Sequence, residues 1–170
     1  MRILTPEQIT NWISLHNQIE DPYLGEEQPL FRIQCYAPRN YTAIESFVEV
    51  FCDQIITSGD LLCHITDDSP TKPSRNIVLD DIRKNLYETR PLQDAPGLLA
   101  ERNEMWNIIA IFSLICCFEW KGYLYGCHNQ LILYNWEGEI FDIWTNSEIK
   151  HNEILDVVKS FQLETIVNVE

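Results

Sequence analysis

The chain has few positive charges. Its 170 residues include 12 Lys and Arg against 26 Asp and Glu, which gives a formal net charge of -14. Nucleic acids and anionic membranes are bound by Lys and Arg side chains that neutralise phosphate, so this balance argues against both as partners. A basic protein partner would be attracted by the same charge, although acidity that serves only solubility is an equally good interpretation.

The chain also lacks a long apolar run and an export signal. Its longest apolar stretch, residues 105–118, would rise roughly 21 Å as a helix, against about 30 Å for the apolar core of a bilayer. The opening sequence MRILTPEQIT leads into a helix start and contains no apolar segment typical of a signal peptide. We therefore expect a cytoplasmic protein whose six cysteines are reduced thiols.

Motifs of common enzymes are missing as well. The sequence contains no glycine-rich phosphate loop, no G-x-S-x-G, no H-E-x-x-H and no paired C-x-x-C. The adjacent Cys127 and His128 fall in an expected tight turn, which offers no pocket for thiolate chemistry. These absences remove the usual sequence signs of a nucleotide, serine-nucleophile or zinc site.

One local group of candidate ligands remains at the end of an expected strand. Side chains alternate along a strand, so His64 and Thr66 share a face while Cys63 points away. His64 with Asp67 and Asp68 has the chemistry to hold a divalent metal or to transfer protons. A half-buried histidine followed by a polar loop gives the same pattern, and we adopt that interpretation. We assign no catalytic, cofactor-binding or metal-binding residue.

The rest of the chain is expected to pack around residues 101–145. Residues 105–118 are apolar on nearly every side, which predicts a buried helix. Three short apolar and aromatic runs follow, separated by the sequences GCHN and WEG, and they predict a three-stranded antiparallel meander. Alternation places Leu131 and Leu133 on one face and Ile132, Tyr134 and Trp136 on the other. Both faces are apolar, so either helices cover both or one of them meets a partner.

The remaining elements follow from capping and periodicity. Thr5, Pro6 and Gln8 form a helix start with a capping box. Along the chain we then expect a strand at 30–36, a helix at 42–56, a strand at 60–66, a helix at 77–88 and a C-terminal helix from 146, with connections at 20–29, 67–76 and 89–98. This pattern predicts a single α+β domain over residues 1–170, an antiparallel sheet of about five strands with helices packed on it.

Several segments of the sequence resemble those of a known family. They are a strand ending in Ile65-Thr66-Asp67, the segment QDAPGLL at 93–99, a glutamate-led apolar helix at 104–118 and an aromatic strand at 119–125. Together, residues 60–145 resemble an uncharacterised bacterial family associated with contact-dependent toxin–immunity loci. The chain departs from this family in the loop DSPTKPSRN and at Glu119, where the family has the glycine of a Phe-Gly-Trp motif. The resemblance implies an immunity protein and transfers no catalytic residue.

Charge, missing motifs and resemblance together predict a cytoplasmic protein-binding inhibitor without a cofactor, an immunity protein that neutralises a toxin with a basic surface. Partner contacts are assigned to acidic loops and to an aromatic residue at the meander turn: Glu26, Glu27, Asp67, Asp68, Trp136, Glu137 and Glu139. One alternative is a metal-dependent or hydrolytic enzyme that uses His64, Asp67 and Asp68. Another is an adaptor subunit with no inhibitory role.

Overall fold

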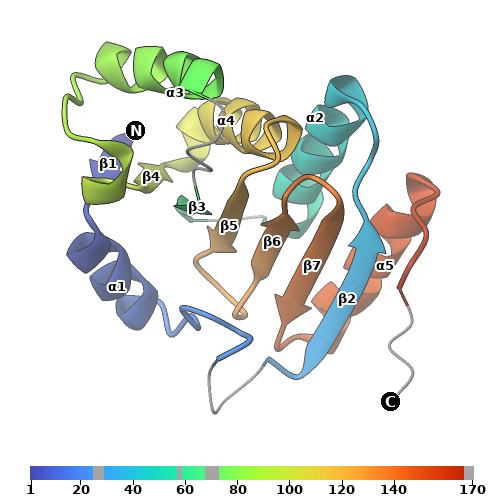
Figure 1. Ribbon diagram of the computed structural model, residues 1–170. Coiled ribbons are helices and arrows are strands. Elements are labelled where there is room, and N and C mark those ends of the chain that lie inside the picture. Colours follow the sequence, from blue (N-terminus) through green and yellow to red (C-terminus); the bar gives the residue numbers. More distant parts are fainter. Residues whose placement is uncertain (25–28, 57–58, 68–72, 167–170) are drawn as a thin grey trace.

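One antiparallel sheet of seven strands organises the part of the chain that the structure describes (Figure 1). In spatial order the strands are β1 (Arg2–Leu4), β4 (Gly97–Ala100), β3 (Leu61–Asp67), β5 (Lys121–Gly126), β6 (Ile132–Trp136), β7 (Ile140–Thr145) and β2 (Phe31–Tyr36). All neighbouring strands run antiparallel. The computed structural model describes residues 1–24, 29–56, 59–67 and 73–166.

The α+β architecture and the β5-β6-β7 meander confirm the sequence prediction, but about five strands was too few. β1 has only three residues, too short to show a period. All four residues of β4 are buried, so it shows no alternation, and Pro96 and Gly97 mark its start as a connection. Gly97 lets α1 (Pro6–Leu15) approach β4, because a Cβ there would lie 2.7 Å from Ile9 Cγ1.

Three helices lie on one face of the sheet (Figure 1). They are α2 (Tyr41–Val50), which continues as a π-helical turn over Phe51–Ile55, α4 (Met105–Cys117) and α5 (Glu148–Ser160). α3 (Pro73–Asn85) contributes Leu79 to the same core. The predicted connection at 67–76 was too long, since α3 begins at Pro73, whose fixed φ suits the first helical turn. None of the described helices is long and apolar enough to cross a bilayer.

The helix predicted at 105–118 is the centre of this core. Ile108, Ile109 and Phe112 in α4 are each at most 1% exposed, and even Ser113 is buried. Such burial on most sides explains why the segment shows no polar stripe. α4 packs against α2 and against the strands beneath it.

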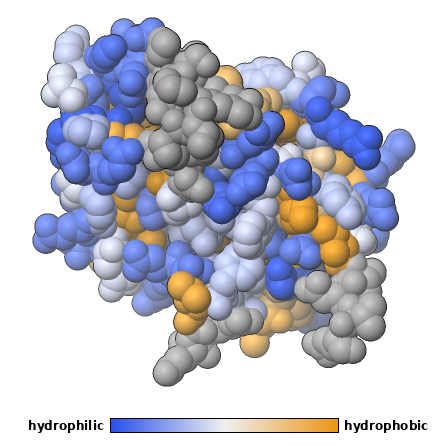
Figure 2. All heavy atoms as spheres, viewed as in Figure 1, coloured by the Kyte–Doolittle hydropathy of each residue, from blue (hydrophilic) through white to orange (hydrophobic). Residues whose placement is uncertain are grey.

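The second face of the sheet is also covered, and Figure 2, seen from the same side as Figure 1, shows hydrophobic residues only in scattered groups among hydrophilic ones. Trp12 and Ile13 of α1 pack with Tyr125 and Trp144 in a second apolar cluster. Residues 17–24 continue across the same face, where the Tyr125 hydroxyl donates to the Glu20 carbonyl at 2.7 Å. The chain itself therefore covers both of the apolar faces predicted from alternation. For most of the meander aromatics, this confirms the interpretation that both faces are covered, not the one in which a face meets a partner.

Candidate functional site

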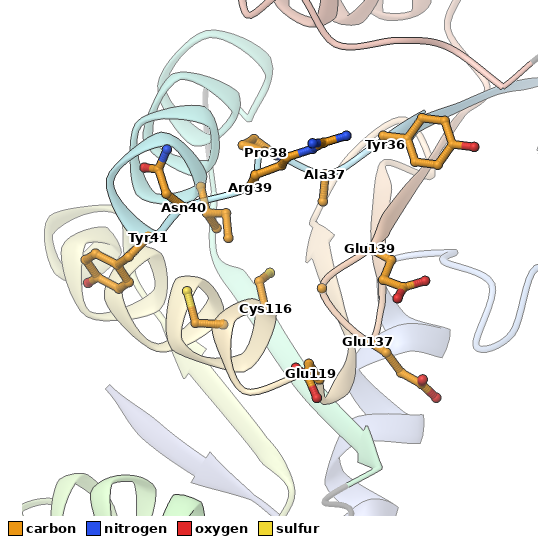
Figure 3. Close-up of a pocket in the computed structure, with 13 residues that line it drawn as sticks. Tyr36, Ala37, Pro38, Arg39, Asn40, Tyr41, Cys116, Glu119, Glu137 and Glu139 are labelled. Carbon is orange, nitrogen blue, oxygen red and sulfur yellow. The ribbon is translucent and has the colours of Figure 1, made fainter.

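A hollow lined by three glutamates lies where three parts of the chain meet at one end of the sheet (Figure 3). It is a groove of about 530 Å³ between the β2–α2 connection, the end of α4 and the β6–β7 turn. Its lining residues are Tyr36, Ala37, Pro38, Arg39, Asn40, Tyr41, Ile44, Cys116, Cys117, Glu119, Glu137, Gly138 and Glu139. We call it the acidic groove. It includes two of the residues assigned from sequence to partner binding, Glu137 and Glu139.

The β6–β7 turn projects two of the groove's carboxylates. Glu137 and Gly138 have φ of 50° and 77°, and the Glu139 amide donates to the Trp136 carbonyl at 2.8 Å, which together make a type I′ hairpin turn. A Cβ on Gly138 would collide with the Cys116 carbonyl oxygen, so only glycine lets the turn pack on the end of α4. The turn therefore fixes both glutamates at the rim.

The third carboxylate follows α4. The Glu119 amide donates to the Cys116 carbonyl at 3.2 Å and the Trp120 amide to the Ile115 carbonyl at 3.1 Å, which is a Schellman ending. Glu119 takes the left-handed position, with φ of 60°, that glycine usually occupies. The carbonyl end of α4 adds partial negative charge to this wall. Lys121 offsets the charge of one of the three carboxylates, because its Nζ lies 3.0 Å from Glu137 Oε1.

Residues 36–41 line the rest of the groove and differ in chemistry; the segment starts beside the turn, where the Ala37 amide donates to the Glu139 carbonyl at 2.8 Å. Arg39 is exposed, and Asn40 caps α2 by accepting from the Ala43 amide at 3.0 Å. Tyr36 and Tyr41 are 50% and 40% exposed on this segment. Figure 3 shows Arg39, Asn40 and Tyr41 across the groove from Glu119, Glu137 and Glu139. Tyr and Arg are enriched at protein interfaces, so this segment has the composition of a contact surface.

Trp136 stands beside the turn and is 37% exposed. Its Nε1 donates to the Tyr23 hydroxyl at 2.7 Å and to Asp142 Oδ2 at 3.0 Å. Lys121 Nζ lies 6.0 Å from its ring centroid. The ring is therefore fixed before any partner arrives, and only part of it is open to contact.

The bonds of Trp136 belong to a buried network that the sequence analysis missed. Asp142 is fully buried and accepts from Arg32 Nε at 2.8 Å, from Gln34 Nε2 at 3.0 Å and from the Tyr23 hydroxyl. Burial opposes the charge of Arg32, but Asp142 outweighs it and the pKa of Arg32 is raised. Burial and the bond to Asp142 raise the pKa of Tyr23. The only sequence signal was one acid in the apolar run of β7.

The residues considered for metal binding are placed differently. His64 is half-buried beside a second hollow of about 370 Å³ that Thr66 also lines, and burial lowers its pKa to about 4. Cys63 is buried, consistent with the predicted alternation. Asp67 ends β3, while Glu26, Glu27 and Asp68 lie outside the described residues. Within the described ranges, no three His, Cys, Asp or Glu side chains are grouped to hold a metal.

The adjacent Cys127 and His128 lie in the β5–β6 connection, as expected. Cys127 is buried, and burial raises the pKa of its thiol. A raised pKa keeps the sulfur protonated, the opposite of an activated nucleophile.

Comparison with protein-family models, curated proteins and solved structures found no match to this chain. The resemblance to a toxin–immunity family stays a prediction from the sequence.

Proposed function

We propose that this chain is an immunity-type inhibitor that acts in the cytoplasm by binding a basic toxin domain. The observation that carries the proposal is the acidic groove, which brings exposed tyrosines and an arginine together with three carboxylates. The toxin's Lys and Arg side chains would meet Glu119, Glu137 and Glu139, and its apolar or planar groups would meet Tyr36 and Tyr41.

Electrostatic attraction supports this assignment both at long range and at the contact surface. The net charge of -14 attracts a basic partner from afar and raises the association rate. Close to the surface, Glu137 and Glu139 stand on a turn that α4 holds in place, so they need little reordering on binding. A toxin whose substrate is nucleic acid carries the complementary positive surface.

The test is equilibrium binding to the toxic product of an adjacent gene, together with protection of cells that express that toxin. Glu137→Gln with Glu139→Gln removes two groove charges at nearly constant shape, and we expect affinity to fall by about tenfold or more. The matched control, Glu7→Gln with Asp156→Asn, removes two exposed charges from α1 and α5 and should change affinity less than about twofold.

A second pair of variants separates lost contacts from misfolding. Glu119→Gly relieves a left-handed backbone and should stabilise the fold by about 1 kcal/mol while it weakens binding. Tyr87→Gly is its control, because Tyr87 has φ of 60° at the end of α3, is 95% exposed and does not line the groove. It should stabilise the fold equally and leave binding unchanged.

The enzyme alternative is tested in the same assay. Replacing His64, Asp67 and Asp68 by alanine should leave protection intact, whereas lost protection together with loss of a stoichiometric metal would favour the enzyme. Groove variants that bind the toxin as tightly as the unaltered chain would refute the acidic groove as the contact surface.

A further inference from the structure

β2 is an edge strand, and its own sequence does little to protect it (Figure 1). Natural proteins shield sheet edges with charges, prolines or a covering segment. The only charged residue in β2 is Arg32, whose Nε is bonded to Asp142, and Pro29 and Pro38 both lie outside the strand. Nothing in β2 itself resists pairing with another strand.

The edge is covered by a short segment of the same chain. The Tyr36 amide donates to the Glu164 carbonyl at 3.0 Å, and the Ile166 amide donates to the Gln34 carbonyl at 2.8 Å. Between these bonds Cys35 and Thr165 form a single antiparallel bridge. Residues 164–166 therefore occupy two of the outward-facing backbone groups of β2, the Tyr36 amide and the Gln34 carbonyl, and we call them the edge strap.

The edge strap is held lightly. Glu164 and Thr165 are exposed, and Ile166 is only half-buried. A groove of about 660 Å³, lined by Tyr36, Ala37, Pro38, Arg39, Phe161, Gln162, Leu163 and Glu164, runs beside its start. A segment with two backbone bonds and little buried side-chain surface opens more readily than the sheet it covers.

We propose that the outer edge of β2 is an interface for a second copy of this chain, and that the edge strap keeps it closed. This inference goes beyond the proposed function and does not depend on it. Two β2 strands paired antiparallel about Gln34 set Arg32 of one copy opposite Tyr36 of the other, with no like charges facing. Ile33 then faces Cys35 of the second copy on the other side. The edge is thus compatible with itself in a closed two-fold arrangement.

The experiment compares three chains by sedimentation equilibrium: the full chain, a chain ending at Ile166 and a chain ending at Leu163. We expect the first two to have the mass of one chain. The chain ending at Leu163 lacks the edge strap and should shift to twice that mass as concentration rises. A chain ending at Leu163 that stays folded and monomeric, or a full chain that is equally dimeric, would overturn the proposal.

Tyr36→Pro in the chain ending at Leu163 identifies the surface used. It removes an amide that points away from β7, so the shortened chain should return to the mass of one copy. A dimer that survives this change uses another surface, and the proposal fails. Should the shortened chain not fold, the full chain carrying Ile166→Pro, which loses its bond to Gln34, is measured by the same criteria.

Discussion

Removing the Asp142 carboxylate is expected to be among the most destabilising single changes on the face of the sheet that α1 covers. Asp142→Ala leaves the donors of Arg32, Gln34, Tyr23 and Trp136 without their common acceptor. These donors join β2, β6 and residues 17–24, so the loss is felt across three parts of the chain.

The magnitude follows from burial. Breaking a buried charge pair costs about 3–5 kcal/mol when the partner stays dry. The Arg32 side chain is 35% exposed and Trp136 is 37% exposed, so water reaches two of the four donors after the change. We therefore expect a loss of about 3 kcal/mol, toward the lower end of that range.

Urea denaturation followed by tryptophan fluorescence measures this loss. Tyr23→Phe is the matched control, because it removes one donor and keeps the ring, and it should cost about 1 kcal/mol. If Asp142→Ala costs less than about 1 kcal/mol with an unchanged denaturant slope, the network does not hold residues 17–24 to the sheet and this account of that face is wrong.

The other stability predictions concern the core, one histidine and the thiols. Phe112→Ala should lower the free energy of unfolding by about 3–5 kcal/mol in a urea melt, because Phe112 is 0% exposed in α4. A loss under about 1 kcal/mol would show that α4 is not the centre of the core. Burial lowers the pKa of His64 to about 4 from 6.5, so the unfolded chain binds the proton first, and stability should fall by roughly 3 kcal/mol as pH drops from 6.5 to 4. His64→Gln should remove that part of the pH dependence. If the variant and the unaltered chain lose stability equally between pH 6.5 and 4, His64 is not its source. Burial raises the pKa of Cys35 and of Cys52 to about 12, so in the native protein only half-buried Cys117 should react quickly with a thiol reagent. None of the six cysteines forms a disulfide, so all six should react after denaturation without reductant; fewer than five reactive thiols would contradict this.

Elements with strong local patterns were predictable from the sequence. α4 and the meander carry long apolar or alternating runs, and the helix starts at Thr5 and Ser147 carry capping residues that the structure confirms. β1 and β4 were not predictable, because their strand conformation comes from pairing with neighbours and not from local sequence.

The acidic groove was predictable only in part. Glu137 and Glu139 were assigned from their place in a turn, which the structure confirms as the β6–β7 hairpin. Tyr36 and Arg39 were missed because they come from the end of β2 and the connection after it, about 100 residues earlier in the chain. No local pattern reports which distant connections meet at one end of a sheet. The network around Asp142 was missed for the same reason, since its members come from β2, β6, β7 and residues 17–24 and meet only in the folded sheet.

The most direct test of the central claim is the rate at which the chain associates with the proposed toxin partner as salt is raised. A partner steered by exposed carboxylates should associate more slowly as the Debye length shrinks to about 8 Å at physiological ionic strength. Glu137→Gln with Glu139→Gln should lower the association rate and flatten its dependence on salt. Trp136→Ala should instead raise the dissociation rate, and Tyr23→Phe, which disturbs the same hydrogen bonds but keeps the tryptophan ring, should raise it less. An association rate that responds neither to salt nor to the groove carboxylates would contradict the claim and would mean that the acidity of this chain serves solubility alone.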